Sequence, residues 1–98
     1  MAGATIAELR ERRDEIVEVA RARGASRVRV FGSVVRGDAG DDSDIDFLVD
    51  LEPGRSLLDL GGLLMDLRDL LDRDVDVVTE GGLRPRVAER VLADAVEL

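Results

Sequence analysis

Two aspartates separated by one residue, Asp44 and Asp46, follow shortly after a Gly-Ser pair at positions 32 and 33. If they lie on a strand, the alternation of side chains places both carboxylates on one face. Two carboxylates this close repel each other, and burying either one alone is costly, so a cation usually lies between them. Mg²⁺ suits such a pair, because it takes one or two carboxylates together with substrate phosphates. The pair therefore favours phosphoryl or nucleotidyl transfer.

The Gly-Ser pair offers a place for those phosphates. Gly32 follows an apolar strand and can adopt backbone angles closed to other residues, which lets a ligand approach the main chain. Ser33 would then begin a short helix, and helix N-termini attract anions. Arg36 is a further candidate, since its planar fork matches phosphate oxygens. Two plainer interpretations stay open: an ordinary turn at Gly32, and a surface ion pair of Arg36 with Asp38 or Asp41.

A third acid, Asp76, strengthens the case for a metal site. It lies between two valines of an expected strand, where an aspartate is unfavourable. If this strand neighbours the one at 45–51, Asp76 projects from the same face as Asp44 and Asp46. Three carboxylates on one face would suit two metal ions, one activating the attacking oxygen and the other holding the triphosphate. A solvated edge strand would also explain Asp76.

Hydrophobic periodicity predicts the elements that hold these residues. A capping-box pattern opens the first and second expected helices, and Pro85 suits the first position of the last one. The expected order is α-β-β-α-β-α. We expect helices over 5–23, over 56–72 and from Pro85 to Leu98, strands over 27–31, 45–51 and 75–79, and a helical turn at 33–36.

Composition limits the possible functions. The chain has 98 residues, of which 45% are hydrophobic, and this fits one folded domain over residues 1–98. It contains no Cys, His or Lys, which excludes disulfides, Cys/His zinc sites, Ser-His-Asp triads and Schiff bases. No segment reaches the ~20 apolar residues that span a membrane, and no apolar signal run opens the chain. We expect a cytoplasmic protein without membrane contact.

The charge distribution argues against a long nucleic acid as substrate. The net charge is −8; residues 1–37 hold eight Arg against five acids, whereas residues 38–98 hold six Arg against seventeen. Such an acidic chain repels a polyanion, and two phenylalanines are its only rings for stacking on bases. A single nucleotide accompanied by Mg²⁺ carries little net charge and needs no row of stacking rings, so it remains a possible substrate. Solubility alone is the plainer explanation of the charge.

Taken together, these motifs resemble the nucleotidyltransferases of the DNA polymerase β superfamily, which share a Gly-Ser motif, an Asp-X-Asp pair and a third acid on a later strand. More narrowly, the chain resembles the minimal nucleotidyltransferases, MntA-like antitoxins paired with a HEPN-domain toxin. The resemblance implies an α+β, two-layer fold, with a mixed β-sheet and helices packed on one face. The residues that carry it are Gly32-Ser33, Arg36-Gly37, Ser43-Asp44-Ile45-Asp46 and Asp76.

The same resemblance implies roles for these residues. Asp44, Asp46 and Asp76 would be the catalytic carboxylates and the metal ligands, holding two Mg²⁺ ions. The implied substrate is ATP, and the implied reaction transfers AMP to a tyrosine of the partner toxin. Nucleotide binding would fall to Gly32, Ser33, Arg36 and Ser43.

Two other functions stay open. The chain would act as a binding module if it neutralised its toxin by occlusion, through an apolar edge of the last helix. It would act on a small molecule if the acceptor were, for instance, an aminoglycoside, although no second domain is there to hold one. The acceptor hydroxyl, the preferred base and the stoichiometry do not follow from the sequence.

Overall fold

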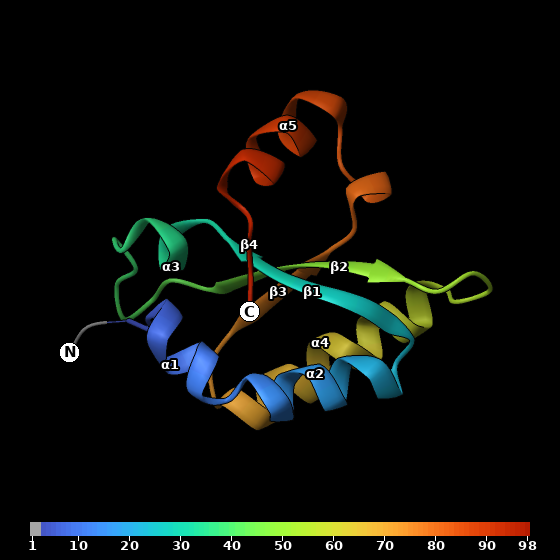
Figure 1. The fold of residues 1–98 in the computed structure, drawn as a ribbon, viewed down its shortest axis with the longest axis horizontal. Coiled ribbons are helices and arrows are strands. Elements are labelled where there is room, and N and C mark those ends of the chain that lie inside the picture. Colours follow the sequence, from blue (N-terminus) through green and yellow to red (C-terminus); the bar gives the residue numbers. More distant parts are fainter. Residues whose placement is uncertain (1–2) are drawn as a thin grey trace.

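The structure, a computed structural model that describes residues 3–98, contains a four-stranded mixed sheet in the order β3-β2-β1-β4 (Figure 1). Strand β1 pairs antiparallel with β2 and with β4, whereas β2 and β3 are parallel. A mixed sheet with helices confirms the predicted α+β class. The strands are β1 (Ala25–Phe31), β2 (Ile45–Leu51), β3 (Val75–Val78) and β4 (Val96–Glu97).

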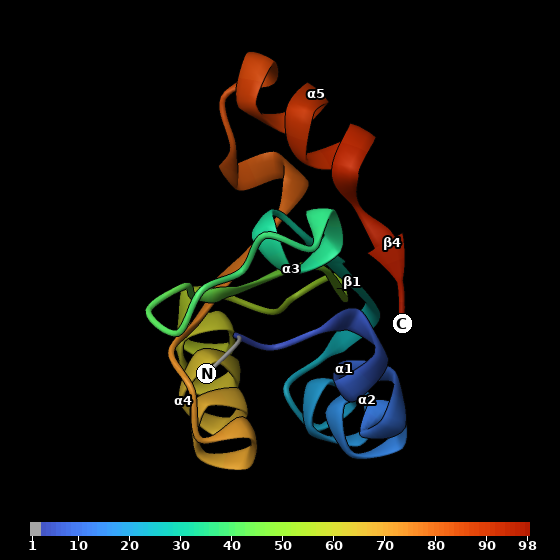
Figure 2. The ribbon, with the colours of Figure 1, turned by 90° about the vertical axis from the view of Figure 1, so that its left-hand side faces the viewer.

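The helices lie on both sides of this sheet. Helices α1, α2 and α4 lie against one face, whereas α5 stands on the other side with the short 3₁₀ helix η1 (Figures 1 and 2). The expectation that the helices pack on one face therefore does not hold for α5, because the chain crosses to the other side of the sheet after β3. The expected turn at 33–36 is present as α3. The helical elements are α1 (Ile6–Glu11), α2 (Arg13–Ala22), α3 (Ser33–Arg36), α4 (Leu57–Leu71), η1 (Glu80–Gly82) and α5 (Pro85–Asp94).

The core lies between the sheet and the pair α2 and α4. Alternate residues of β2, among them Ile45, Phe47 and Val49, are buried against these helices, and each contributes on the order of 1.5–3 kcal/mol by leaving water. Leu63 and Leu67 of α4 close the core from the helix side. Because strand side chains alternate, the intervening residues of β2 point to the opposite face, and Asp46 is one of them.

The first predicted helix is interrupted at Arg12, where α1 ends and α2 begins. At this point the Arg12 side chain donates a hydrogen bond of 2.9 Å from Nη1 to the carbonyl of Leu70, near the end of α4. A basic side chain commonly bonds the last carbonyls of a helix in this way. The contact joins segments far apart in the chain, so periodicity within 5–23 does not reveal it.

The last predicted helix is too long. Helix α5 ends at Asp94, and the next residues form β4, which pairs with Arg29 and Val30 of β1. The edge of β1 offers backbone groups to a passing chain, and this pairing outweighs continuation of the apolar stripe. Part of that stripe is not core, since Val87 is 42% exposed and Leu92 is 38% exposed.

Helix α4 begins with a capping box that is expected to matter for stability. The Ser56 hydroxyl accepts from the backbone N–H of Leu58 at 3.2 Å, and the Asp59 carboxylate accepts from that of Ser56 at 3.1 Å. We expect Ser56→Ala to cost about 1 kcal/mol, a fall of about 4–8 °C in Tm for a domain of this size. Thermal unfolding by circular dichroism measures this, and Ser56→Thr should retain most of the stability. An unchanged Tm for Ser56→Ala would show that the box contributes nothing.

Candidate active site

Gly32 forms the junction between β1 and α3, and its geometry excludes a side chain. Its φ is 80° and its ψ is −149°, a combination that essentially only glycine adopts. A Cβ at this position would lie 2.5 Å from Oδ2 of Asp46. The main chain of the Gly-Ser turn is therefore in close contact with the carboxylate of the Asp-X-Asp motif, although the two are distant in sequence.

Asp46 and Asp76 occupy paired positions on neighbouring parallel strands. This confirms that the strand carrying Asp76 neighbours β2. The prediction that Asp76 lies on the same face as the other two acids depended on this condition. Asp44 comes directly before β2 begins and is exposed, as is Asp76, whereas Asp46 is half-buried. The three acids thus come together at the start of β2 and on the sheet face that lies away from α2 and α4.

The electrostatics of Asp46 reflect this proximity. Partial burial raises the pKa of its carboxyl, and the negative charges of Asp76 and then Asp44 raise it further, while Arg36 acts in the opposite direction. Both acids are therefore close enough to disfavour the ionised form of Asp46. A cation at this position would relieve the repulsion.

Arg36, at the end of α3, forms ion pairs with two acids and also acts electrostatically on Asp46. Its Nε lies 3.6 Å from Oδ2 of Asp38, and its Nη1 donates to Oδ2 of Asp94 at 2.9 Å. The first of these partners was among the alternatives that the sequence left open. Asp94 was missed, because it lies at the end of α5 and only the fold brings it to α3. The Arg36 side chain remains 52% exposed, so a ligand can still reach it.

Ser43 has a structural role in the loop before β2. Its hydroxyl accepts a hydrogen bond of 3.0 Å from the backbone N–H of Gly40. It also lines an open hollow of about 850 Å³ beside the C-terminal part of α4, and none of Gly32, Asp44, Asp46 and Asp76 lines this hollow. The nucleotide-binding role of Ser43 stays a prediction.

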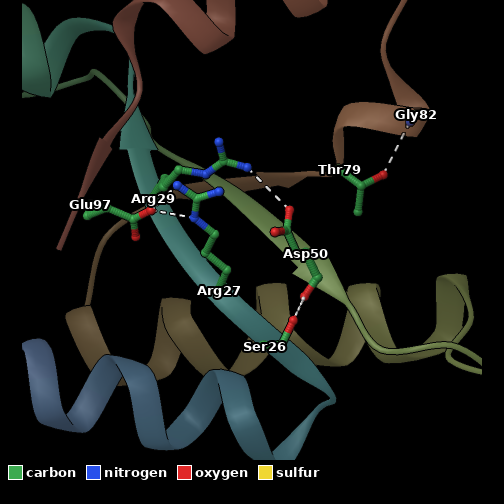
Figure 3. Close-up of polar contacts among 7 residues, drawn as sticks. All are labelled: Ser26, Arg27, Arg29, Asp50, Thr79, Gly82 and Glu97. Carbon is green, nitrogen blue, oxygen red and sulfur yellow. Dashed lines mark hydrogen bonds and ion pairs between the residues drawn. The ribbon is translucent and has the colours of Figure 1, made fainter.

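Arg29 is a buried charge that the sequence analysis did not single out. It lies on the same face as Asp46, with its side chain only 10% exposed, and its Nη2 donates to Oδ1 of Asp50 at 3.2 Å (Figure 3). Its buried Nε has no hydrogen-bond partner. Burying a guanidinium charge without a partner is costly, so the ion pair with Asp50 is required to keep Arg29 in this position. The alternating pattern of β1 gave no signal that this face would be covered.

The acids suit magnesium as a partial ligand set. Within residues 3–98, no three side chains of Asp, Glu, His or Cys are arranged so that they alone could hold a metal ion. Mg²⁺ does not require such a cage, because it is bound through one or two carboxylates with water and substrate phosphates. The all-oxygen donors and the repulsion around Asp46 fit this mode of binding.

In the described part of the chain, none of the helices combines the length and the apolar character that crossing a membrane requires.

Comparisons with known proteins identify the family of the chain. The model of the nucleotidyltransferase domain family matches residues 7–98. The protein adenylyltransferase MntA of Thermococcus cleftensis is 44% identical over 73 residues, which are 74% of this chain and 74% of that protein. A solved structure described as a minimal nucleotidyltransferase is 47% identical, and the match covers 100% of both chains with a TM-score of 0.85.

A more distant solved structure shares the fold. It contains a tri-AMPylated HEPN toxin of Shewanella oneidensis in complex with an MNT antitoxin. The matched chain is 20% identical with a TM-score of 0.69, and the match covers 90% of this chain and 69% of that one. At this identity the likeness concerns the fold alone.

Proposed function

The chain belongs to the nucleotidyltransferase domain family, and we propose that it is a protein adenylyltransferase, which moves AMP from ATP to a hydroxyl of a partner protein. The family membership confirms the resemblance found in the motifs. The observation that carries the proposal is the contact between the Gly32 main chain and Asp46, with Asp76 paired beside it. One domain over residues 1–98 and a cytoplasmic location are parts of the same proposal.

The acceptor that we propose is a tyrosine of a HEPN-type toxin, which the protein would neutralise as an antitoxin. Support comes from the relative named as an adenylyltransferase and from the solved complex that contains an AMPylated HEPN toxin. The domain itself is small, so a partner protein would supply the surface that holds the acceptor. Transfer to a small molecule lacks such support.

The reaction forms a bond between the acceptor oxygen and the α-phosphorus of ATP and breaks the bond between that phosphorus and the pyrophosphate oxygen. Asp44, Asp46 and Asp76 would hold Mg²⁺, which when bound neutralises charge on the triphosphate and on the departing pyrophosphate. Asp76, as an exposed carboxylate, would accept the proton from the attacking hydroxyl.

The main chain at Gly32 and the hydroxyl of Ser33 would position the phosphates. Gly32 has no side chain to keep a ligand from the backbone, and its left-handed φ turns the chain sharply out of β1. Ser33 is half-buried and begins α3 directly beside this turn. The phosphates would thus lie beside both the turn and the acids.

Arg36 is expected to neutralise part of the triphosphate charge. Arg36→Gln should raise the KM for ATP by roughly tenfold, because a charge-assisted hydrogen bond to phosphate is lost, while kcat changes less. Steady-state kinetics of pyrophosphate release measure both constants. Asp94→Asn is the matched control, since it removes the ion-pair partner and keeps the guanidinium. An unchanged KM for Arg36→Gln would assign Arg36 to the surface ion pairs alone.

The experiment that tests the proposal is intact-protein mass spectrometry. The chain is co-expressed with a HEPN-type toxin, the class of partner proposed above, and the purified pair is incubated with MgATP. We expect the partner to gain one or more AMP units, and we expect no gain with Asp44→Asn. A partner whose mass stays unchanged in a stable complex would overturn the proposal.

One observation favours a second candidate, neutralisation by occlusion. Helix α5 stands apart from the sheet with Val87 and Leu92 exposed, and such a surface is available to a partner (Figure 2). Occlusion does not require the acids. If Asp44→Asn neutralised the partner as well as the unchanged protein does, occlusion would account for the function.

A further inference from the structure

Helix α4 carries an apolar stripe on the side that faces away from the core. Within the described residues, the three most exposed large hydrophobic side chains all belong to this helix: Leu57 at 82%, Leu58 at 86% and Met65 at 53%. Leu58, Gly61 and Met65 follow the spacing i, i+3 and i+7, which places them on one face, and Leu57 borders that face. We call these four residues the α4 stripe. Since the opposite side of α4 packs into the core, the helix is apolar on both sides, a pattern typical of a helix that is covered on both sides.

The α4 stripe contains no charge. The first three turns of the helix hold two charged residues, Asp59 and Asp66. Asp66 pairs with Arg23 at the end of α2, and Asp59 pairs with Arg55, whose side chain lies against Gly24 just beyond α2. Both acids therefore belong to the flank toward α2, which covers only one side of α4 (Figure 2). In a chain of which 37% is charged, an exposed apolar helix face without charges indicates a contact surface.

Gly61 has no reason within the chain to be a glycine. It lies inside α4, and a Cβ at this position would meet nothing within 4 Å. The neighbouring Gly62, by contrast, leaves room for Arg23, whose Nη1 would lie 2.6 Å from a Cβ. A glycine inside a helix lowers its stability relative to alanine. An open glycine in the middle of an apolar stripe is explained if another backbone approaches closely there.

We propose that the α4 stripe is the contact surface of a homodimer, in which α4 packs antiparallel against the same helix of a second copy. A twofold axis passes beside Gly61, so that Leu57 of each copy contacts Met65 of the other, because both residues lie four positions from Gly61. The missing Cβ of Gly61 lets the two backbones approach at the axis. The candidate active site lies on the sheet face away from α4, so the dimer leaves it uncovered, and the proposal does not depend on the proposed function.

Charges at the ends of the α4 stripe complement each other in this arrangement. Two chains with a net charge of −8 repel each other, so a self-contact requires an uncharged centre and paired ends. Asp69 continues the line of Gly61 and Met65 by four residues, and within the described residues it has no ion-pair partner. Antiparallel packing about Gly61 brings Asp69 near Arg55 of the second copy, and the twofold axis forms this pair twice. A lipid surface fits less well, because helices that lie on membranes carry Lys and Arg beside their apolar face, whereas acids flank this one on the side toward α2.

Sedimentation velocity of the full chain, from about 1 μM to about 1 mM, measures the association. We expect a dimer with a Kd in the micromolar range, because a stripe on one helix is smaller than a standard protein interface. Leu58→Gln with Met65→Gln should raise this Kd by roughly tenfold or more, since two apolar side chains no longer leave water. Val87→Gln with Leu92→Gln is the matched control: it removes two exposed apolar side chains from α5, and we expect less than about a twofold change.

Two results of this measurement would overturn the proposal. One is an equal rise in Kd from both pairs of substitutions, which would mean that the contact is not specific to α4. The other is a monomer at every concentration, whether or not a different protein binds through Leu58 and Met65.

Introduced thiols test the position of the axis, because the chain contains no cysteine. Gly61→Cys should cross-link two copies when diamide oxidises the thiols, since residues at the axis meet the short Cβ distance that a disulfide requires. Gly81→Cys in η1, where a Cβ also meets nothing within 4 Å, is the matched control and should stay uncross-linked. Non-reducing electrophoresis measures both. Equal cross-linking of the two variants, or none at Gly61→Cys, would overturn the antiparallel dimer.

Gly61→Gln distinguishes a contact at the axis from a general loss of folding. Circular dichroism at a concentration below the Kd should show a higher Tm than that of the unchanged chain, because glutamine favours a helix more than glycine does. Sedimentation should show a Kd raised by roughly tenfold or more, because the longer side chain keeps the two backbones apart. An unchanged Kd would contradict the close approach at Gly61 and overturn the proposal.

Discussion

Asp46→Asn is expected to lower AMP transfer on the order of 10³-fold or more while the protein stays folded. The substitution keeps the size of the side chain and removes the charge that would hold the metal beside the triphosphate. Losing one group that stabilises charge in a transition state has an effect of this scale. Asp46 is the central acid of the three, because it is paired with Asp76, flanked by Asp44 and in contact with the Gly32 main chain.

The same substitution is expected to stabilise the fold at neutral pH. Burial and the two neighbouring acids raise the pKa of Asp46, so its ionised form is less favourable in the folded chain than in the unfolded one. A raised pKa contributes stability at low pH that is lost as the pH rises through the folded value. We therefore expect Asp46→Asn to gain roughly 0.5 kcal/mol at pH 7, a gain that shrinks as the pH falls toward about 4.

Pyrophosphate release measures the effect on activity. Urea unfolding at pH 7 and at about pH 4 measures the effect on stability. Asp42→Asn is the matched control, since Asp42 is exposed in the loop before β2 and outside the paired strands. It should change activity by less than about twofold. Full activity of Asp46→Asn would show that Asp46 is not a metal ligand. Lower stability at pH 7 would show that its charge is compensated in the folded chain.

The sequence predicts the fold where the pattern is local. Strand β2 has the predicted bounds, 45–51, because Pro-Gly follows it and its apolar residues alternate. The break at Arg12 and the strand at Val96–Glu97 were not predicted. At the first, the Arg12 side chain contacts the carbonyl of Leu70, and the second pairs with the edge of β1, so both places meet segments distant in the sequence. Local periodicity does not contain such contacts.

In the candidate site, too, some residues could be predicted from local patterns and others only from the fold. The Asp-X-Asp pair and Gly32-Ser33 could be singled out from residue types, because each motif alone has a plainer explanation but their combination resembles one family. The position of Asp76 depended on strand order, and the parallel pairing with β2 supplies it. Asp94 and Arg29 were missed, because their partners Arg36 and Asp50 come from other elements and their motifs are not local.

Gly32→Ala is expected to damage both stability and activity, and its effect separates the site from ordinary backbone strain. An alanine would suffer the cost of a glycine-only backbone conformation, about 1–3 kcal/mol. Its Cβ would also meet Oδ2 of Asp46 at 2.5 Å, so the carboxylate must move. We expect the folded fraction to lose AMP transfer by roughly 10²-fold, because a shift of about 1 Å at a reacting group has that scale.

Gly37→Ala provides the control at the other end of α3. Its φ is also positive, 81°, but a Cβ there would meet nothing within 4 Å. It should therefore lose about 1–2 kcal/mol from backbone strain and keep nearly full activity per folded molecule. Urea unfolding gives the folded fraction of each variant, and pyrophosphate release gives its activity. If both glycine variants kept the same activity per folded molecule, the contact between Gly32 and Asp46 would have no part in catalysis, and the phosphates would have to be held elsewhere.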